Sequence, residues 1–147
     1  MKNIFSVAQF TATPYNTAED KVKWANAMAS WVQRGFPESG WRKGLYDGLY
    51  IHMYSHIAEY NQYGFYCVWF DGIDKQLQWL KYASKGGYLP GGAGHPEYTW
   101  SDVEKAFSAW IKENGFIAKY QKLVDDSIET QERAQLSHLL KKYGISE

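Results

Sequence analysis

The chain has 147 residues, of which 18% are aromatic, and its 16 basic and 16 acidic side chains give a formal net charge of zero. This length matches one domain, so residues 1–147 are expected to form a single helical domain with an interior built largely from aromatic rings. The neutral charge argues against general nucleic-acid binding and against a polybasic membrane anchor.

The N-terminal third of the chain predicts one long helix after an irregular start. Residues 4–11 alternate weakly, which indicates either a short strand or an extended arm, and this is the place for a minor β element. The apolar stretch there is too short and too interrupted for a secretion signal. Asn16 or Thr17 can cap a helix that runs to about Arg34, where Gly35 supplies the stop.

A second helix is expected to begin between Ser39 and Lys43 and to end at about Tyr63, with Gly64 as its stop. Residues four apart share one face of a helix, and here that face carries a row of glycines that leads into histidines and a tyrosine: Gly40, Gly44, Gly48, His52, His56, Tyr60 and Gly64. Two explanations stay open for the glycines. Either they allow close packing or form a loop, or they leave the backbone bare for a ligand.

His52, His56 and Glu59 are candidate metal ligands, because their i, i+4, i+7 spacing places them within an arc of roughly 60°. The same three side chains could instead carry out acid–base chemistry or bind a polar ligand. The alternative is structural: two histidines at the edge of the core, hydrogen-bonded to Glu59 and to tyrosines such as Tyr60 and Tyr63. The pattern is not the HExxH metalloprotease motif.

Trp41 and Arg42 lie at the junction of the first two helices. A ring beside an arginine is the arrangement that holds nucleotides and single strands by stacking. The competing interpretation is a solvated corner in which Trp41 covers the core.

The middle of the chain carries one short apolar run and one glycine-rich loop. Residues 65–70 are far fewer than the ~20 needed to span a bilayer, and they form either a helix or a buried strand. Cys67, the single cysteine, provides no disulfide framework and no cysteine-based metal site, which favours a cytoplasmic location. The loop at 86–99 can bind an anion through its backbone amides or act as a recognition loop through Tyr88 and His95; alternatively it is a plain connector.

The C-terminal part of the chain predicts two more helical regions. Ser101 begins a capping box and a helix with a buried stripe that comprises Val103, Phe107, Trp110 and Ile111. Residues 116–143 are helical with a break expected near 125–127, and their final apolar stripe comprises Leu136, Leu139, Leu140 and Tyr143. The chain should therefore be predominantly all-α, an irregular bundle of five to six helices.

Three functions follow as hypotheses. The first is a non-enzymatic binding domain that holds a nucleotide-like small ligand or a protein partner in an aromatic-rich cleft. Its site residues would be His52, His56, Glu59, Tyr60, Tyr63, Trp41, Arg42, Tyr88 and His95. The second is a metal-dependent or acid–base enzyme that uses His52, His56 and Glu59. The third is a structural or assembly protein that forms a homo-oligomer. The sequence identifies no cofactor.

Overall fold

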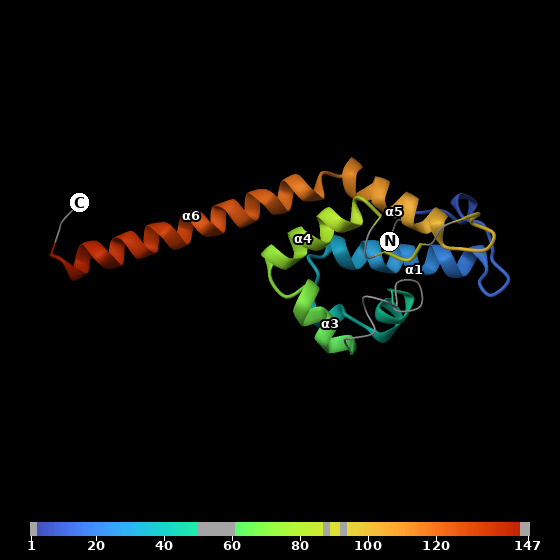
Figure 1. Ribbon diagram of the computed structural model, residues 1–147, viewed down its shortest axis with the longest axis horizontal. Helices are drawn as coiled ribbons and strands as arrows, with labels where there is room; N and C mark the ends of the chain where they lie inside the picture. Colours follow the sequence, from blue (N-terminus) through green and yellow to red (C-terminus); the bar gives the residue numbers. More distant parts are fainter. Residues whose placement is uncertain (1–2, 50–60, 87–88, 92–93, 145–147) are drawn as a thin grey trace.

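The computed structural model describes residues 3–49, 61–86, 89–91 and 94–144, and within those ranges it is predominantly helical without any strand (Figure 1). This confirms the all-α prediction. The longer helices are α1 (Ala18–Gln33), α3 (Gln62–Trp69), α4 (Ile73–Ala83), α5 (Ser101–Glu113) and α6 (Phe116–Lys142). Short 3-10 helices lie at η1 (Val7–Gln9) and η2 (Glu38–Gly40), and residues 43–49 are also helical.

The helices form a body from which α6 projects. Helix α1 packs against η1 and α5, while α4 packs against α3, α5 and α6. The first turns of α6 lie on this body, and the rest of the helix carries the chain away from the other elements (Figure 1).

Helix α1 begins and ends where the sequence predicts. The Thr17 hydroxyl accepts a hydrogen bond from the Asp20 amide at 3.0 Å, and the Asp20 carboxylate accepts one from the Thr17 amide at 2.9 Å, which completes a capping box. At the other end Gly35 adopts a φ of 88° and Phe36 follows with a φ of 56°. The Phe36 amide donates to the Trp31 carbonyl at 3.3 Å, so the last turn of the helix is closed by its own backbone.

The core is built from rings, as the composition predicts. Trp31 is fully buried at its centre, with ring centroids 4.9 Å from Trp41, 4.9 Å from Phe70 and 5.2 Å from Phe36. Six of the seven tryptophans are at most 8% exposed and belong to one buried cluster: Trp24, Trp31, Trp41, Trp79, Trp100 and Trp110. Offset and edge-on ring pairs of this kind add about 0.5–1.5 kcal/mol each beyond the burial of their area.

One predicted helix end in the first two thirds of the chain is wrong, and of the two alternatives considered for residues 4–11 the strand is not found. Gly64 does not end a helix; it lies inside α3, which starts afresh at Gln62 because the Asn61 side chain accepts from the Gly64 amide at 2.6 Å and caps the new helix. Residues 4–11 contain η1 in place of a strand. This segment is held by Asn26 of α1, whose side-chain oxygen accepts from the Phe5 amide at 2.7 Å.

Two predictions for the C-terminal helices are also wrong. Ser101 does not form the capping box of α5, because it is the first residue of that helix and its hydroxyl donates to the Gly94 carbonyl at 3.1 Å. No break occurs at 125–127, since α6 is continuous. Lys122 pairs with Asp126 at 2.8 Å across the start of the expected break, and Glu129 pairs with Arg133 at 2.6 Å just after it.

Candidate functional site

Several of the residues expected to form a site lie outside the described residues. They are His52, His56, Glu59, Tyr60 and Tyr88. The metal and acid–base hypotheses for the first three therefore stay predictions. Among the residues that the structure does describe, no three His, Cys, Asp or Glu side chains come together as a metal site would require.

Trp41 belongs to the core. It is 7% exposed, and its ring lies nearly parallel to that of Phe65 with a centroid distance of 6.1 Å. Its indole N–H donates to the Gln62 carbonyl at 2.7 Å, and the Gln62 amide returns a bond to the Trp41 carbonyl at 3.2 Å. This side chain therefore ties the start of α3 to the segment before residue 43.

Tyr63, by contrast, is 64% exposed on α3. A hydrogen bond with the Cys67 side chain, followed by the repulsion of nearby negative charge, raises the pKa of its hydroxyl. The structure does not place this ring beside Trp41 in one cleft, because Trp41 is buried and Tyr63 faces outward.

The glycine row is divided between packing and an open groove. A Cβ on Gly48 would overlap the Trp24 indole, and one on Gly40 would lie 2.9 Å from Trp31, so both glycines permit close packing. Gly44 has no described atom within 4 Å of its Cβ position. It lines a groove of about 300 Å³ together with Asp20, Lys23, Trp24, Ala27, Arg42 and Leu45. The close-packing explanation therefore holds at Gly40 and Gly48, whereas a ligand beside Gly44 stays a prediction.

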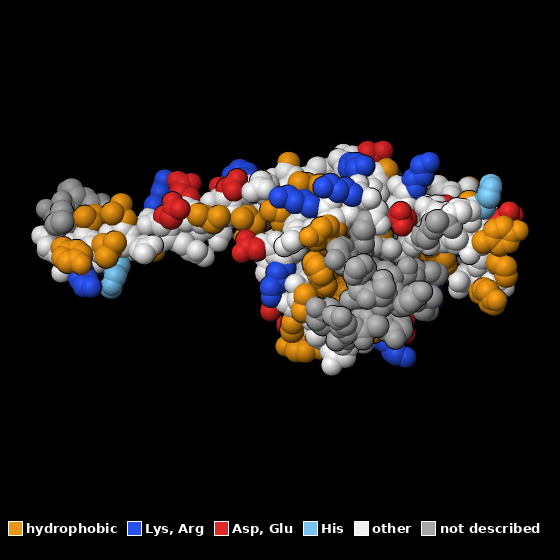
Figure 2. All heavy atoms as spheres, viewed as in Figure 1, with side chains coloured by type: hydrophobic (Ala, Val, Ile, Leu, Met, Phe, Trp, Pro, Cys, Tyr) orange, Lys and Arg blue, Asp and Glu red, His pale blue; other side chains and the backbone are white. Residues whose placement is uncertain are grey.

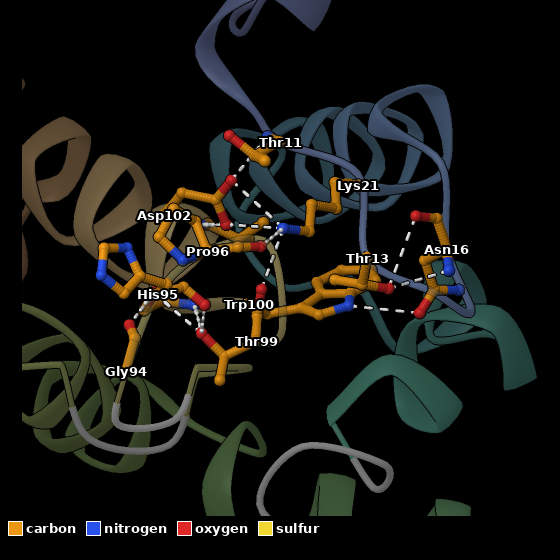
Figure 3. A network of polar contacts seen from close by, with 12 residues as sticks. Thr11, Thr13, Asn16, Lys21, Gly94, His95, Pro96, Thr99, Trp100 and Asp102 are labelled. Atoms are coloured by element: carbon orange, nitrogen blue, oxygen red, sulfur yellow. Dashed lines mark hydrogen bonds and ion pairs between the residues drawn. The ribbon is translucent and has the colours of Figure 1, made fainter.

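The glycine-rich loop is fastened to α1 by Lys21. This lysine side chain is fully buried and donates to the Pro96 carbonyl at 2.8 Å and the Thr99 carbonyl at 2.9 Å, as Figure 3 shows. It also forms an ion pair with Asp102 of α5 at 3.0 Å. Asp102 in turn accepts from the Thr11 amide at 2.8 Å. A buried ammonium is tolerated only with such a full set of acceptors.

His95 takes part in this network through its backbone. Its carbonyl accepts from the Tyr98 amide at 3.0 Å and from the Thr99 hydroxyl at 3.0 Å, while the side chain is exposed. Residues 94–99 of the loop thus form a folded turn held on α1 and α5.

Glu104 of α5 explains two of the loop glycines. A Cβ on Gly86 would lie 2.8 Å from the Glu104 carboxylate, and one on Gly91 would overlap it. The sequence suggested that these glycines expose amides to an anion. The negatively charged group beside Gly86 and Gly91 is the Glu104 carboxylate of the protein itself.

Several of the exposed large hydrophobic side chains lie on α6. The buried residues of this helix are Phe116, Tyr120 and Val124, all in its first nine positions, and no residue from 125 to 144 is buried. We call residues 125–143 the projecting segment. Hydrophobic side chains recur along it and gather toward its end (Figure 2).

Four apolar residues of the projecting segment share one face, which we call the α6 stripe. They are Ile128, Leu136, Leu139 and Tyr143, with exposures of 48%, 54%, 41% and 66%. At about 100° per residue they span an arc of roughly 80°. Leu136, Leu139 and Tyr143 were predicted as a stripe, whereas Ile128 was missed because a helix break was expected just before it.

Charge is distributed unevenly along the projecting segment. Residues 125–132, which we call the acidic half, carry Asp125, Asp126, Glu129 and Glu132, and residues 133–143, which we call the basic half, carry Arg133, Lys141 and Lys142. The acidic half has four negative charges and the basic half three positive ones. The segment therefore presents opposite signs at its two ends.

Sequence reasoning overlooked Lys21, although a signal was present. Lys21 lies four residues before Ala25 and seven before Met28, both of which are completely buried, so it shares their face of α1. A lysine in register with a buried stripe requires acceptors from elsewhere in the fold.

No described helix is both long enough and apolar enough to cross a membrane. No protein family model matches the chain, and no curated protein or solved structure is similar to it.

Proposed function

We propose that this chain is a non-enzymatic binding domain whose partner is a protein, and that the projecting segment of α6 is the binding element. The observation that carries the proposal is the α6 stripe, an apolar face on a helix in which no described residue beyond Val124 is buried. An apolar face of this kind gains about 25 cal/mol per Å² when a partner covers it.

The low stability of isolated helices in water supports a partner for the projecting segment. Helices in water are marginal without tertiary packing, and most of their stability in proteins comes from burial of an amphipathic face. The ion pairs on α6 contribute only about 0.3–0.5 kcal/mol each, because all of them are exposed. A covering helix would supply the burial that the projecting segment lacks.

The chemistry of the stripe defines the partner as an amphipathic helix. Its apolar side would cover Ile128, Leu136, Leu139 and Tyr143. It would carry basic residues opposite 125–132 and acidic residues opposite 133–142, because unlike charges across a helix pair favour the correct partner and like charges oppose it. A cytoplasmic location belongs to this proposal, since the single cysteine requires no oxidising compartment.

The test uses a fluorescently labelled synthetic helix as long as the projecting segment, with a leucine stripe, lysines in the half that faces 125–132 and glutamates in the half that faces 133–142. Anisotropy titration should show saturable binding to the full chain. The variant Leu136→Glu/Leu139→Glu should weaken binding by more than about tenfold, because two apolar contacts are replaced by charges.

The matched control is Ala134→Glu/Ser137→Glu, which adds the same two charges in the same turns but on the opposite face of α6. Both residues are exposed. This control should bind the synthetic helix like the unchanged chain. Equal loss in both variants, or no binding by a chain whose circular dichroism shows α6 intact, would contradict the proposal.

A further inference from the structure

We propose that the helix which covers the α6 stripe is the α6 of a second copy of this chain, paired antiparallel, so that the protein is a two-fold symmetric dimer. This inference rests on the proposed function and names its partner. It is carried by the charge distribution, the length and the exposure of the projecting segment.

Charge selects the orientation. An antiparallel second copy places the acidic residues from Asp125 to Glu132 beside the part of the other helix that carries Lys141 and Lys142, while Arg133 lies next to the two-fold axis, and the symmetry repeats this at the other end. A parallel copy would instead place four carboxylates beside four carboxylates and three cations beside three cations. The antiparallel pair therefore satisfies the charge requirement of the partner helix with no sequence other than its own.

The length of the projecting segment fits full overlap. Its midpoint is Ala134, and a two-fold axis there brings Asp126 of each copy level with Lys142 of the other, and Asp125 level with Tyr143. The two bodies then lie at opposite ends of the pair, because each body ends at Val124, just before the overlap begins. Figure 1 shows no other element of the chain beside this part of α6.

The stripe supplies the apolar contact. Its members lie on both sides of Ala134, with Ile128 before it and Leu136, Leu139 and Tyr143 after it. In the antiparallel pair the three apolar residues of each second half cover the first half of the other helix, where Ile128 and the carbon stems of Glu129 and Glu132 lie. All four residues of the α6 stripe in each copy thereby face the other helix, and the symmetry makes this true at both ends of the pair.

The experiment is a charge exchange in the full-length chain. One variant carries Asp125, Asp126, Glu129 and Glu132→Lys, and its projecting segment is basic throughout. The other carries Arg133, Lys141 and Lys142→Glu, and its projecting segment is acidic throughout. Sedimentation velocity should give a concentration-dependent rise from 17.0 kDa toward twice that mass for the unchanged chain.

Each variant alone should dimerise at least about tenfold more weakly than the unchanged chain, and an equimolar mixture of the two should recover the dimer. Far-UV circular dichroism of each variant reports whether α6 is still helical. A chain that stays at 17.0 kDa at high concentration, or variants that each dimerise as well as the unchanged chain, would overturn the inference.

Orientation is tested by disulfide trapping in a Cys67→Ser background, which removes the single native thiol. A mixture of Asp125→Cys and Tyr143→Cys chains should give the mixed disulfide on oxidation. Predominant linkage of Tyr143→Cys to itself would show a parallel pair and overturn the antiparallel arrangement.

These outcomes are separable from failure of the proposed function. A chain that is monomeric but binds the synthetic helix through Leu136 and Leu139 refutes the second copy as partner and leaves the proposed function standing. A chain that does neither refutes both.

Discussion

The ammonium of Lys21 lies 3.0 Å from the carboxylate of Asp102, and this ion pair joins α1 to α5 beneath the glycine-rich loop. The Lys21 side chain is fully buried and that of Asp102 is 11% exposed. Because the lysine also donates to two loop carbonyls, its removal would leave the Asp102 carboxylate without its cationic partner and would take a donor from each of two backbone oxygens.

We therefore expect Lys21→Met to lower the free energy of unfolding by about 3–5 kcal/mol, the usual cost of removing one partner from a buried pair. Lys23→Met is the control, since Lys23 is an exposed lysine two residues away, and it should change the stability by less than about 0.5 kcal/mol. Urea unfolding followed by tryptophan fluorescence measures both variants. Similar stabilities for the two would contradict the role assigned to Lys21.

A second prediction compares two glycines of one short helix. Gly48→Ala should destabilise the protein by about 1–3 kcal/mol, because the new Cβ would overlap the Trp24 indole and force residues 43–49 away from α1. Gly44→Ala, whose Cβ position meets no described atom within 4 Å, should be neutral or stabilise by up to about 1 kcal/mol through its higher helix propensity. Thermal unfolding measures the stability of both variants. An equal loss of stability at the two positions would contradict the close packing assigned to Gly48.

A third prediction concerns Gly91 and Glu104. Gly91→Ala alone should destabilise the loop, since its Cβ would occupy the place of the Glu104 carboxylate. Combining it with Glu104→Ala removes the overlap, so the double variant should be less destabilised than the sum of the two single variants by at least about 0.5 kcal/mol. Strict additivity in this cycle would mean that the carboxylate moves aside without cost.

A fourth prediction follows from two buried phenols. Burial raises the pKa of Tyr66 and of Tyr120 above the usual 10.0 of an unfolded chain. The folded state then holds these protons more tightly, so the stability they contribute is complete below pH 10 and is lost as the pH rises through the folded-state pKa values. The loss should approach about 1.4 kcal/mol per pH unit for each tyrosine.

Tyr120→Phe is the informative variant for this effect, because it keeps the ring. We expect it to be close to neutral near pH 7 and to unfold less readily than the unchanged chain above about pH 10. Urea titrations at both pH values provide the comparison. An unchanged alkaline loss in the variant would exclude Tyr120 as one of its sources.

The sequence predicted the fold class because its signals were local. Thr17 and Gly35 mark the ends of α1, and the stripe from Val103 to Ile111 marks the buried side of α5. The boundaries that failed depended on contacts with distant residues or on competing local bonds. Asn61 caps the start of α3 at a point where a continuous helix was expected. The Ser101 hydroxyl, which was expected to cap α5, donates instead to the Gly94 carbonyl.

The site was less predictable than the fold, for a physical reason. The partners of Lys21 lie at Pro96, Thr99 and Asp102, and no local pattern connects residues so far apart in the chain. The apolar stripe at the end of α6 was visible in the sequence. Its exposure was not, because a stripe looks the same whether the body of its own chain or another protein covers it.

Helix α6 is continuous and is anchored in the core at its first turns only, so it can act as a lever. Phe116, Tyr120 and Val124 fix the first turns of the helix in the ring core, and the remaining residues extend it by about 1.5 Å each without a hinge. A force applied at Tyr143 is therefore transmitted along a stiff rod to Tyr120, whose ring meets that of Phe36 at 5.7 Å. A partner bound at the far end of α6, as proposed above, would therefore be mechanically coupled to the aromatic core.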